Sequence, residues 1–317
     1  MSARAAAVTR RLRGWAWIWS LAGGAVAYLA TAVLQQRLSW EALVTNLGLA
    51  GFLVVVGLGQ MLVITGGAGG IDLSVSGMVT LAAILQATVA HGRDGAAMLA
   101  GVGAALGAGL LLGAVNGALV VGLRLPAMVA TLATGFMLDS LIQLYYGVGQ
   151  GGAPSPALAR WVHGSLLGLP DMLWLSLLLT ALAGLLLQHT RYGRHLEAGG
   201  QSEAAAELTG IRVGRVRFLS YVLSSLAASL GGVLLGAYAG GAFLGMGSPY
   251  QLGSIAAVVL GGSLIAGGRS TALGVFGGAV LLRFLETGMQ ATGLSAGARN
   301  VLEGAMIILV LALRRAG

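Results

Sequence analysis

The chain has 317 residues, of which 57% are hydrophobic and only 9% are charged, whereas about 25% of the residues of an ordinary soluble domain are charged. This composition excludes a water-soluble globular protein. All 18 residues counted as lysine or arginine are arginine, and cysteine is absent. The sequence therefore lacks a P-loop lysine, a Schiff-base lysine, disulfides and thiolate metal sites.

The formal charge of +8 would suit nucleic-acid binding, but the mean hydropathy of +0.88 and the 54 glycines fit a different class. They are typical of membrane helices packed through small residues. We therefore expect no nucleic-acid partner and read the excess arginine as a topology signal. The four histidines show no ligand spacing, and no metal site is predicted.

Apolar segments follow one another along almost the whole chain. A membrane-spanning helix needs about 20 mostly apolar residues, because unpaired backbone groups in hydrocarbon are costly and a helix pairs its own. Ten segments approach this length, which predicts an all-α polytopic membrane protein forming one domain over 1–317. The segment 251–266 is short and glycine-rich, so it could also be re-entrant or broken. The ten are 15–33, 43–65, 72–90, 97–122, 125–147, 168–188, 217–240, 251–266, 271–289 and 299–313.

The arginine positions give the predicted orientation, because cytoplasmic loops carry an excess of positive charge. Ten crossings with both termini cytoplasmic leave only Arg37, Arg93, Arg160 and Arg299 outside. On the inside lie Arg4, Arg10, Arg11, Arg13, Arg124, Arg191, Arg194, Arg212, Arg215, Arg217, Arg269, Arg314 and Arg315. A basic tail over 1–14 and the loop over 190–216 are thus predicted to be cytoplasmic.

A stripe of small residues recurs every four positions in the segment 97–122, so that another backbone can approach it closely. Packing inside one subunit and a seam between two copies are both possible, and the first is the plainer interpretation. The stripe consists of Ala97, Gly101, Ala105, Gly109, Gly113 and Gly117.

Three short tracts stand out from the apolar background. In 66–74 a glycine run precedes Asp72 and Ser74, and Asp72 can accept hydrogen bonds from the first turn of the next helix. The polar stretch 189–216 contains a predicted short helix over 203–208, which starts after Ser202 and stops at Gly210. In 256–270, paired glycines permit sharp turns. A helix cap, a solvated loop and plain turns are the respective alternatives to a functional role.

Three ionisable residues fall inside predicted spans, where a lone charge costs at least about 2.5–3.5 kcal/mol at the bilayer centre. Arg283 and Glu286 are three residues apart and can pair with each other on one helix. Asp139 has no local partner, and we expect it to face the interior of the bundle.

At these tracts the sequence resembles the permease subunits of carbohydrate-type ABC importers, the ribose-permease family, over about 45–313. The likeness begins with a GGIDLSVG-like tract at 69–77, where Ser76 displaces a glycine, and continues through the other tracts in order. These are Asn116-Gly117, Pro126, Thr131-Leu132, Ala198-Gly199-Gly200, Ala204-Ala205, Gly210-Ile211, 256–262 and 267–269. Where relatives commonly have Arg-Gly, this chain has Asp139-Ser140.

The resemblance implies a permease, not an enzyme, that translocates a small sugar or sugar-like solute across the inner membrane of a prokaryote. It implies four kinds of partner: a second permease copy or homologue, an ABC ATPase, an extracytoplasmic substrate-binding protein and membrane lipid. The chain itself would bind no cofactor, and ATP-Mg would sit on the ATPase. A permease for a nucleoside or a branched-chain amino acid, or an ion-coupled secondary transporter, is the alternative.

Two groups of site residues follow from the resemblance. The ATPase-coupling loop would use Arg191, Arg194, Glu197, Gly199, Gly200, Gln201, Glu203, Ala204, Ala205, Glu207, Gly210 and Arg212. The candidates for the translocation pathway are Asp72, Ser74, Asn116, Thr131 and Asp139.

Overall fold

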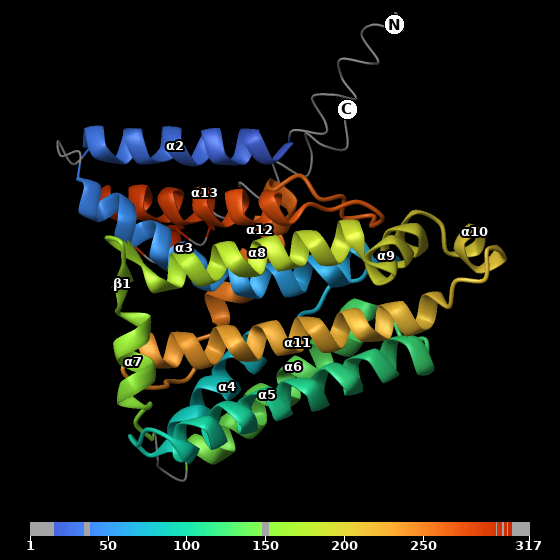
Figure 1. Ribbon diagram of the computed structural model, residues 1–317, viewed down its shortest axis with the longest axis horizontal. Coiled ribbons are helices and arrows are strands. Elements are labelled where there is room, and N and C mark those ends of the chain that lie inside the picture. Colours follow the sequence, from blue (N-terminus) through green and yellow to red (C-terminus); the bar gives the residue numbers. More distant parts are fainter. Residues whose placement is uncertain are drawn as a thin grey trace, which may run out of the picture.

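A computed structural model describes residues 16–34, 39–147, 152–295, 297–299, 301–302 and 304–305. It is a helical bundle with one two-residue-strand hairpin in the described part (Figure 1). The elements are α2 (Ala16–Leu34), α3 (Trp40–Thr65), α4 (Val75–Ala90), α5 (Ala96–Gly117), the π-helix η1 (Ala118–Gly122), α6 (Ala127–Gly147), α7 (Pro156–Val162), β1 (Ser165–Leu166), β2 (Leu169–Pro170), α8 (Asp171–His189), α9 (Arg191–Gln201), α10 (Glu203–Leu208), α11 (Val213–Tyr238), α12 (Ser248–Leu260) and α13 (Ala272–Ala291).

These helices confirm the predicted class, an all-α polytopic membrane protein. Each predicted segment from 15–33 to 271–289 overlaps a helix, although in 251–266 the helix ends at Leu260, whereas the tail 1–14 and most of 299–313 lie outside the described residues. Within the described part, six helices are long and apolar enough to cross a membrane, and three apolar stretches are shorter. One of the shorter ones is α12, whose 13 residues span roughly 20 Å at the α-helical rise, less than a bilayer core.

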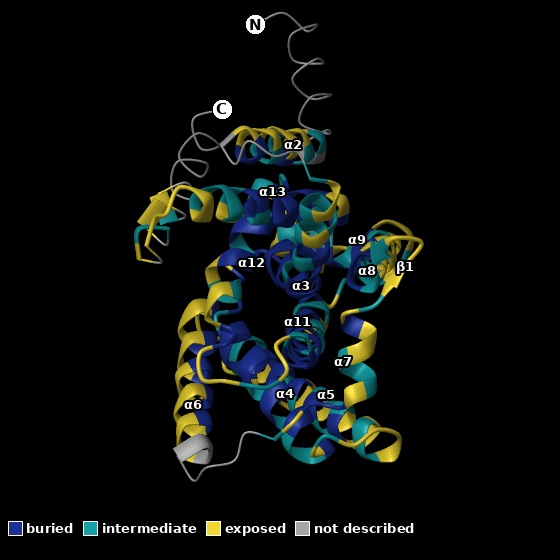
Figure 2. Ribbon diagram, turned by 90° about the vertical axis from the view of Figure 1, so that its left-hand side faces the viewer, coloured by how far each residue is buried: buried dark blue, intermediate teal, exposed yellow. Residues whose placement is uncertain are grey.

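The central element is α3, which is almost entirely buried from its middle to its C-terminal end (Figure 2). Glycines on its surface let neighbours approach closely, because a side chain there would meet their atoms. A Cβ on Gly51 would lie 2.9 Å from the Met172 carbonyl oxygen of α8, and one on Gly59 would lie 2.9 Å from Ser224 Cα of α11. Helix α3 is thus packed closely against α8 and α11.

The small-residue stripe of α5 packs inside the subunit, as the plainer interpretation has it. A Cβ on Gly113 would lie 2.5 Å from Val222 Cα, and one on Gly117 would lie 2.7 Å from the Phe218 ring, both on α11. At the other end of the stripe, Gly101 lies against the backbone of Gln86 on α4. The stripe thus fixes α5 against α4 and α11.

One end of the bundle carries α7, whose first turn is held by Asp94 from the loop after α4. The Asp94 carboxylate accepts hydrogen bonds from Ser155 Oγ (2.5 Å) and the Ala157 N–H (2.7 Å), and it pairs with Arg160 at 3.3 Å. The hydrogen bonds from Ser155 and Ala157 hold the pKa of Asp94 below its ordinary value of 3.8.

We expect α7 to come loose at acid pH because of this contact. A carboxylate whose pKa is lower in the folded state adds stability above its unfolded pKa, and that contribution is lost as the pH falls through the folded value. The protection of the α7 amides against hydrogen exchange, relative to the intrinsic rate at each pH, should therefore fall only below pH 3.8. The Asp94→Asn variant should show faster exchange at neutral pH and lose this pH dependence. Exchange in α7 that is equal in both proteins at neutral pH would contradict the assignment.

Candidate functional site: a glycine junction and a buried polar cluster

Three glycine pairs, far apart in sequence, meet at the end of the bundle opposite α7. They are Gly66-Gly67 after α3, Gly199-Gly200 in α9 and Gly267-Gly268 between α12 and α13; we call them the glycine junction. A Cβ on Gly200 would overlap the Thr65 carbonyl oxygen, and one on Gly267 would overlap Gly67 Cα. The three tracts that stand out separately in the sequence therefore share one contact, which only glycine permits.

Hydrogen bonds close the glycine junction. The Gly268 N–H donates to the Thr65 carbonyl (2.8 Å), and Gln201 Nε2 donates to the Gly268 carbonyl (3.1 Å). Thr65 Oγ1 also donates to Ser270 Oγ at 2.8 Å. These bonds link the end of α3, the end of α9 and the turn before α13 to one another.

The stretch 190–216 is more ordered than predicted, because it contains two helices. The predicted short helix is confirmed as α10, with Ser202 Oγ accepting from the Ala205 N–H at 3.3 Å. The helix α9 was not predicted: Thr190 caps it by accepting from the Gly193 N–H at 3.1 Å, and Leu196 is buried against the core. Its sequence is polar and contains three glycines, so no local pattern predicts a helix. The helix is stabilised by the packing of its buried face against the rest of the bundle.

Arg217, at the start of α11, ties this pair of helices to the glycine junction. Its Nε donates to the Gly66 carbonyl (2.9 Å), and its Nη1 pairs with Glu203 of α10 at 2.7 Å. The Arg217 side chain is only 14% exposed, whereas that of Glu203 is 49% exposed, so solvent reaches the pair from the side of α10. In the sequence, Arg217 stands at the edge of the polar stretch with no predicted role beyond orientation, since no local signal reveals its two distant partners.

Most of the predicted coupling residues lie on the surface of α9 and α10. Glu197, Gly199 and Gly200 are partly or fully covered, and burial raises the pKa of Glu197 while Arg269 opposes the shift. Leu208 of α10 is 89% exposed, an apolar side chain beside charged neighbours. The exposed members are Arg191, Arg194, Gln201, Glu203, Ala204, Ala205, Glu207, Gly210 and Arg212.

The second part of the site is a buried polar cluster just beyond the glycine junction, where α3 has ended and α4 begins. Asp72 accepts from the Ser74 N–H (3.0 Å), from Ser74 Oγ (2.6 Å) and, on its other oxygen, from Ser224 Oγ (2.9 Å). Asn116 of α5 donates to Ser74 Oγ at 2.8 Å. The carboxylate therefore joins the break before α4 to α11 and, through Ser74, to α5.

Two threonines of α6 extend this cluster. Thr134 Oγ1 donates to Asn116 Oδ1 at 2.7 Å, and Thr131 Oγ1 accepts from the Leu73 N–H at 3.0 Å. When its amide is oriented to satisfy both atoms, Gln60 of α3 pairs with the backbone N–H and carbonyl of Asp72 at 3.2 Å. The cluster thus contacts α3, α4, α5, α6 and α11.

Of the five pathway candidates, the structure brings four together: Asp72, Ser74, Asn116 and Thr131, all fully buried. Their hydrogen bonds hold the non-helical segment 66–74 in a fixed shape, and a role in solute passage stays a prediction. Sequence reasoning missed Thr134 and Ser224. Thr134 could have been found, because it lies three residues after Thr131 on the same helical face.

The fifth candidate, Asp139, corrects an expectation. It does not face the interior of the subunit: its side chain is exposed on α6. The buried face of α6 repeats at helical spacing through Thr131, Thr134, Leu138 and Ile142, and the residue after Leu138 is rotated about 100° away from it. The exposed face around Asp139 is apolar, with Phe136, Met137, Leu141 and Leu144.

The predicted ion pair on α13 is confirmed, with Arg283 Nη1 2.8 Å from Glu286 Oε2. Arg283 Nε also donates to Asn46 Oδ1 of α3 at 3.1 Å, and Thr287 Oγ1 donates to the same oxygen at 2.7 Å. The pair lies away from both parts of the site described above.

Comparison of the sequence with known proteins identifies the family of the chain. The sequence model of the family described as "Branched-chain amino acid transport system / permease component" matches residues 42–311. The chain belongs to this permease family. It is 35% identical over 261 residues to the ribose import permease protein RbsC of Escherichia coli (strain K12), covering 81% of this chain and 80% of that one. The resemblance to ribose permeases is thereby confirmed.

Other relatives agree. The chain is 33% identical over 299 residues to the probable ABC transporter permease protein y4mJ of Sinorhizobium fredii, covering 92% of this chain and 87% of that one. It is 34% identical over 163 residues to the autoinducer 2 import system permease protein LsrD of Photorhabdus laumondii, about half of each chain. This member of the permease family is therefore a multi-pass transport subunit and not an enzyme.

Proposed function

We propose that this chain is the permease subunit of an ATP-driven ABC importer that moves a small sugar or sugar-like solute across the inner membrane of a prokaryote. Two relatives support the solute class, since one is named for ribose import and another for autoinducer 2 import. The apolar helices described above supply the membrane domain.

The proposed assembly contains two permease copies or a permease and a homologue, an ABC ATPase that holds ATP-Mg, and an extracytoplasmic substrate-binding protein, all in membrane lipid. Ten crossings would leave both termini in the cytoplasm, on the side of α9 and α10. This orientation agrees with the arginine-rich residues at that end, including Arg191, Arg194 and Arg212, and places α7 outside.

The observation that carries this proposal is the chain of contacts from the exposed α9–α10 surface to the buried polar cluster. Gly200 lies against Thr65, and the segment that follows Thr65 leads directly to Asp72. If an ATPase moves α9 and α10 during its cycle, the glycine junction passes this movement to the break before α4. Helices α5, α6 and α11, which the cluster joins, then shift with it, which is how access would alternate.

Transport by the whole importer tests the proposal. Proteoliposomes containing the permease, its ATPase and its binding protein should accumulate radiolabelled D-ribose or D-glucose when ATP is present on the ATPase side. Deletion of 202–208 should remove ATPase binding as well as accumulation. Accumulation of L-leucine or a nucleoside in place of sugars would overturn the solute class, and uptake abolished by a protonophore but unaffected by loss of the ATPase would overturn the ABC assignment.

A further inference from the structure

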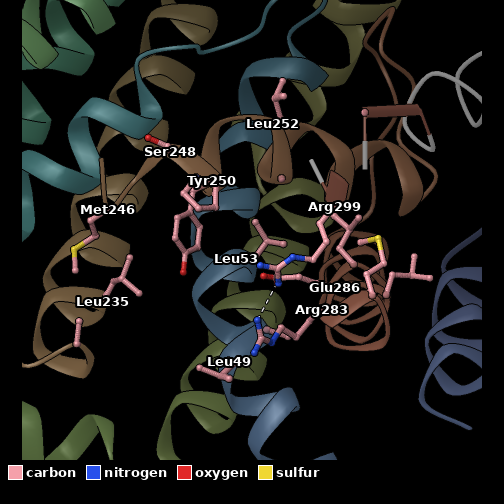
Figure 3. Close-up of a pocket in the computed structure, with 18 of the residues that line it drawn as sticks. Leu49, Leu53, Leu235, Met246, Ser248, Tyr250, Leu252, Arg283, Glu286 and Arg299 are labelled. Carbon is pink, nitrogen blue, oxygen red and sulfur yellow. Dashed lines mark hydrogen bonds and ion pairs between the residues drawn. The ribbon is translucent and has the colours of Figure 1, made fainter. Parts of the chain in front are cut away.

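A cavity of about 620 Å³ lies among α3, α11, α12 and α13, away from the glycine junction and the polar cluster. Its walls are mostly apolar, with Leu49, Leu235, Met246 and Leu252 among them. Into this apolar space project two arginines and one glutamate, Arg283, Glu286 and Arg299, and their side chains point toward one another (Figure 3).

These charged groups retain unused hydrogen-bonding capacity. Nε of Arg299 is buried and has no hydrogen-bond partner among the described residues. Arg283 uses Nε and Nη1, for Asn46 and Glu286, and the described part of the chain provides no partner for its Nη2. Buried donors normally find an acceptor, so an unpaired guanidinium N–H beside a cavity indicates a missing ligand or water.

The cavity lies in the half of the bundle opposite α9 and α10. Its walls come from the first half of α3, the last residues of α11, the first residues of α12 and the second half of α13. The opposite ends of α3 and α11 lie at the glycine junction, where Thr65 accepts from the Gly268 N–H and Arg217 donates to the Gly66 carbonyl. In the proposed orientation the cavity therefore belongs to the outer half of the membrane, where solute enters.

We propose that this cavity is a solute-binding site for a neutral polyhydroxyl compound, with Arg283, Glu286 and Arg299 as the groups that select it. The inference rests on the proposed function and deepens it. Guanidinium N–H groups donate to hydroxyl oxygens in a fixed planar geometry, and the Glu286 carboxylate, which is 48% exposed, accepts from a neighbouring hydroxyl. Both kinds of partner stand side by side, as adjacent hydroxyls of a sugar require.

The same charges disfavour the cationic end of an amino acid. Arg283 already neutralises Glu286 by donating to its Oε2, and Gln290 donates to its Oε1 at 3.2 Å, so the remaining lone pairs suit a neutral hydroxyl donor better than the α-ammonium group of an amino acid. The three charged residues that line the cavity carry a net charge of +1, two arginines against one glutamate. A cationic end would therefore meet repulsion there, whereas a hydroxyl would not.

The absence of cysteine from the chain makes a direct test possible. Ser248 lines the cavity and is exposed, so a Ser248→Cys variant places a single thiol at its wall. The permease, purified with its ATPase in proteoliposomes without ATP, is treated with a water-soluble maleimide, and labelling of the permease polypeptide is followed. We expect D-ribose or D-glucose to slow the labelling, and L-leucine at the same concentration to leave it unchanged.

Three further variants sharpen this test, one at the proposed site and two as matched controls. Ser165→Cys, exposed on β1 outside the cavity, should be labelled equally with and without sugar. In the Ser248→Cys background, Arg299→Gln should raise the half-protecting sugar concentration about tenfold or more, since a charged donor is lost. Arg93→Gln, an exposed arginine outside the cavity, should leave that concentration unchanged.

The possible outcomes separate the site from the proposed function. Protection by L-leucine and not by sugars overturns the polyhydroxyl assignment. Sugar accumulation driven by ATP without any protection of the introduced thiol overturns the site while the proposed function stands. Protection by sugars in an importer that accumulates none with ATP leaves the site in place and overturns the proposed function.

Discussion

Gly200→Ala is expected to reduce coupled transport strongly while leaving the membrane bundle able to insert. The added methyl group would overlap the Thr65 carbonyl oxygen and lie 2.5 Å from the Gly268 nitrogen, both backbone atoms that cannot turn aside. Such overpacking costs about 1–3 kcal/mol, and it must be relieved by moving α9 away from the glycine junction. Solute accumulation per ATP hydrolysed, measured in proteoliposomes, should fall by about tenfold or more.

Gly107→Ala is the matched control, because Gly107 is also helical and a Cβ added there would meet no described atom within 4 Å. Alanine in an exposed helix interior should raise stability slightly, by about 0.5–1 kcal/mol, and leave transport unchanged. Normal coupling in Gly200→Ala would show that α9 does not act through the glycine junction.

Asp72→Ala should be the most destabilising change in the polar cluster. It removes the acceptor of Ser74 Oγ, of the Ser74 N–H and of Ser224 Oγ, all buried. Each donor left unpaired in an apolar interior costs about 1–3 kcal/mol. The thermal unfolding midpoint of the detergent-purified chain should drop steeply, and Asp72→Asn, which keeps one acceptor oxygen, should lose less.

Asp139→Ala provides the comparison, since Asp139 is exposed in the single chain and has no hydrogen bond within its described part. We expect its unfolding midpoint to stay close to that of the unchanged protein. Equal midpoints for Asp72→Ala and Asp139→Ala would mean that the cluster does not hold the helices together.

The parts of the fold that sequence predicts well are those with local signals. Apolar length located the long helices, and Ser202 followed by good helix formers and Gly210 located α10. The helix α9 was not predicted, because its buried face consists of Gly193, Leu196 and Gly199. These residues form an interface only where they pack against other segments of the chain. Propensity alone argues against a helix with three glycines, and tertiary packing overrides it.

The candidate site shows the same division. Each glycine tract is visible in the sequence, but that Gly67, Gly200 and Gly267 touch is a property of the whole bundle. The expectation for Asp139 was wrong for a different reason. Burial in a helix depends on rotation about the helix axis as well as on depth in the membrane, and apolar length indicates only the depth. The partners of Asp72 on α11 and of Arg217 on α10 likewise have no sequence signature.

The exposed face of α6 around Asp139 has a consequence for the assembly of the protein in the membrane. A newly inserted single copy would present the Asp139 carboxyl to lipid among Phe136, Met137 and Leu141, at an energetic penalty of at least about 2.5–3.5 kcal/mol at mid-depth. Covering by another subunit would remove that penalty. Unassembled copies would thus expose a carboxyl group to lipid, a feature that membrane proteases can recognise. Production of this chain without its partner subunits should therefore shorten its lifetime in the cell.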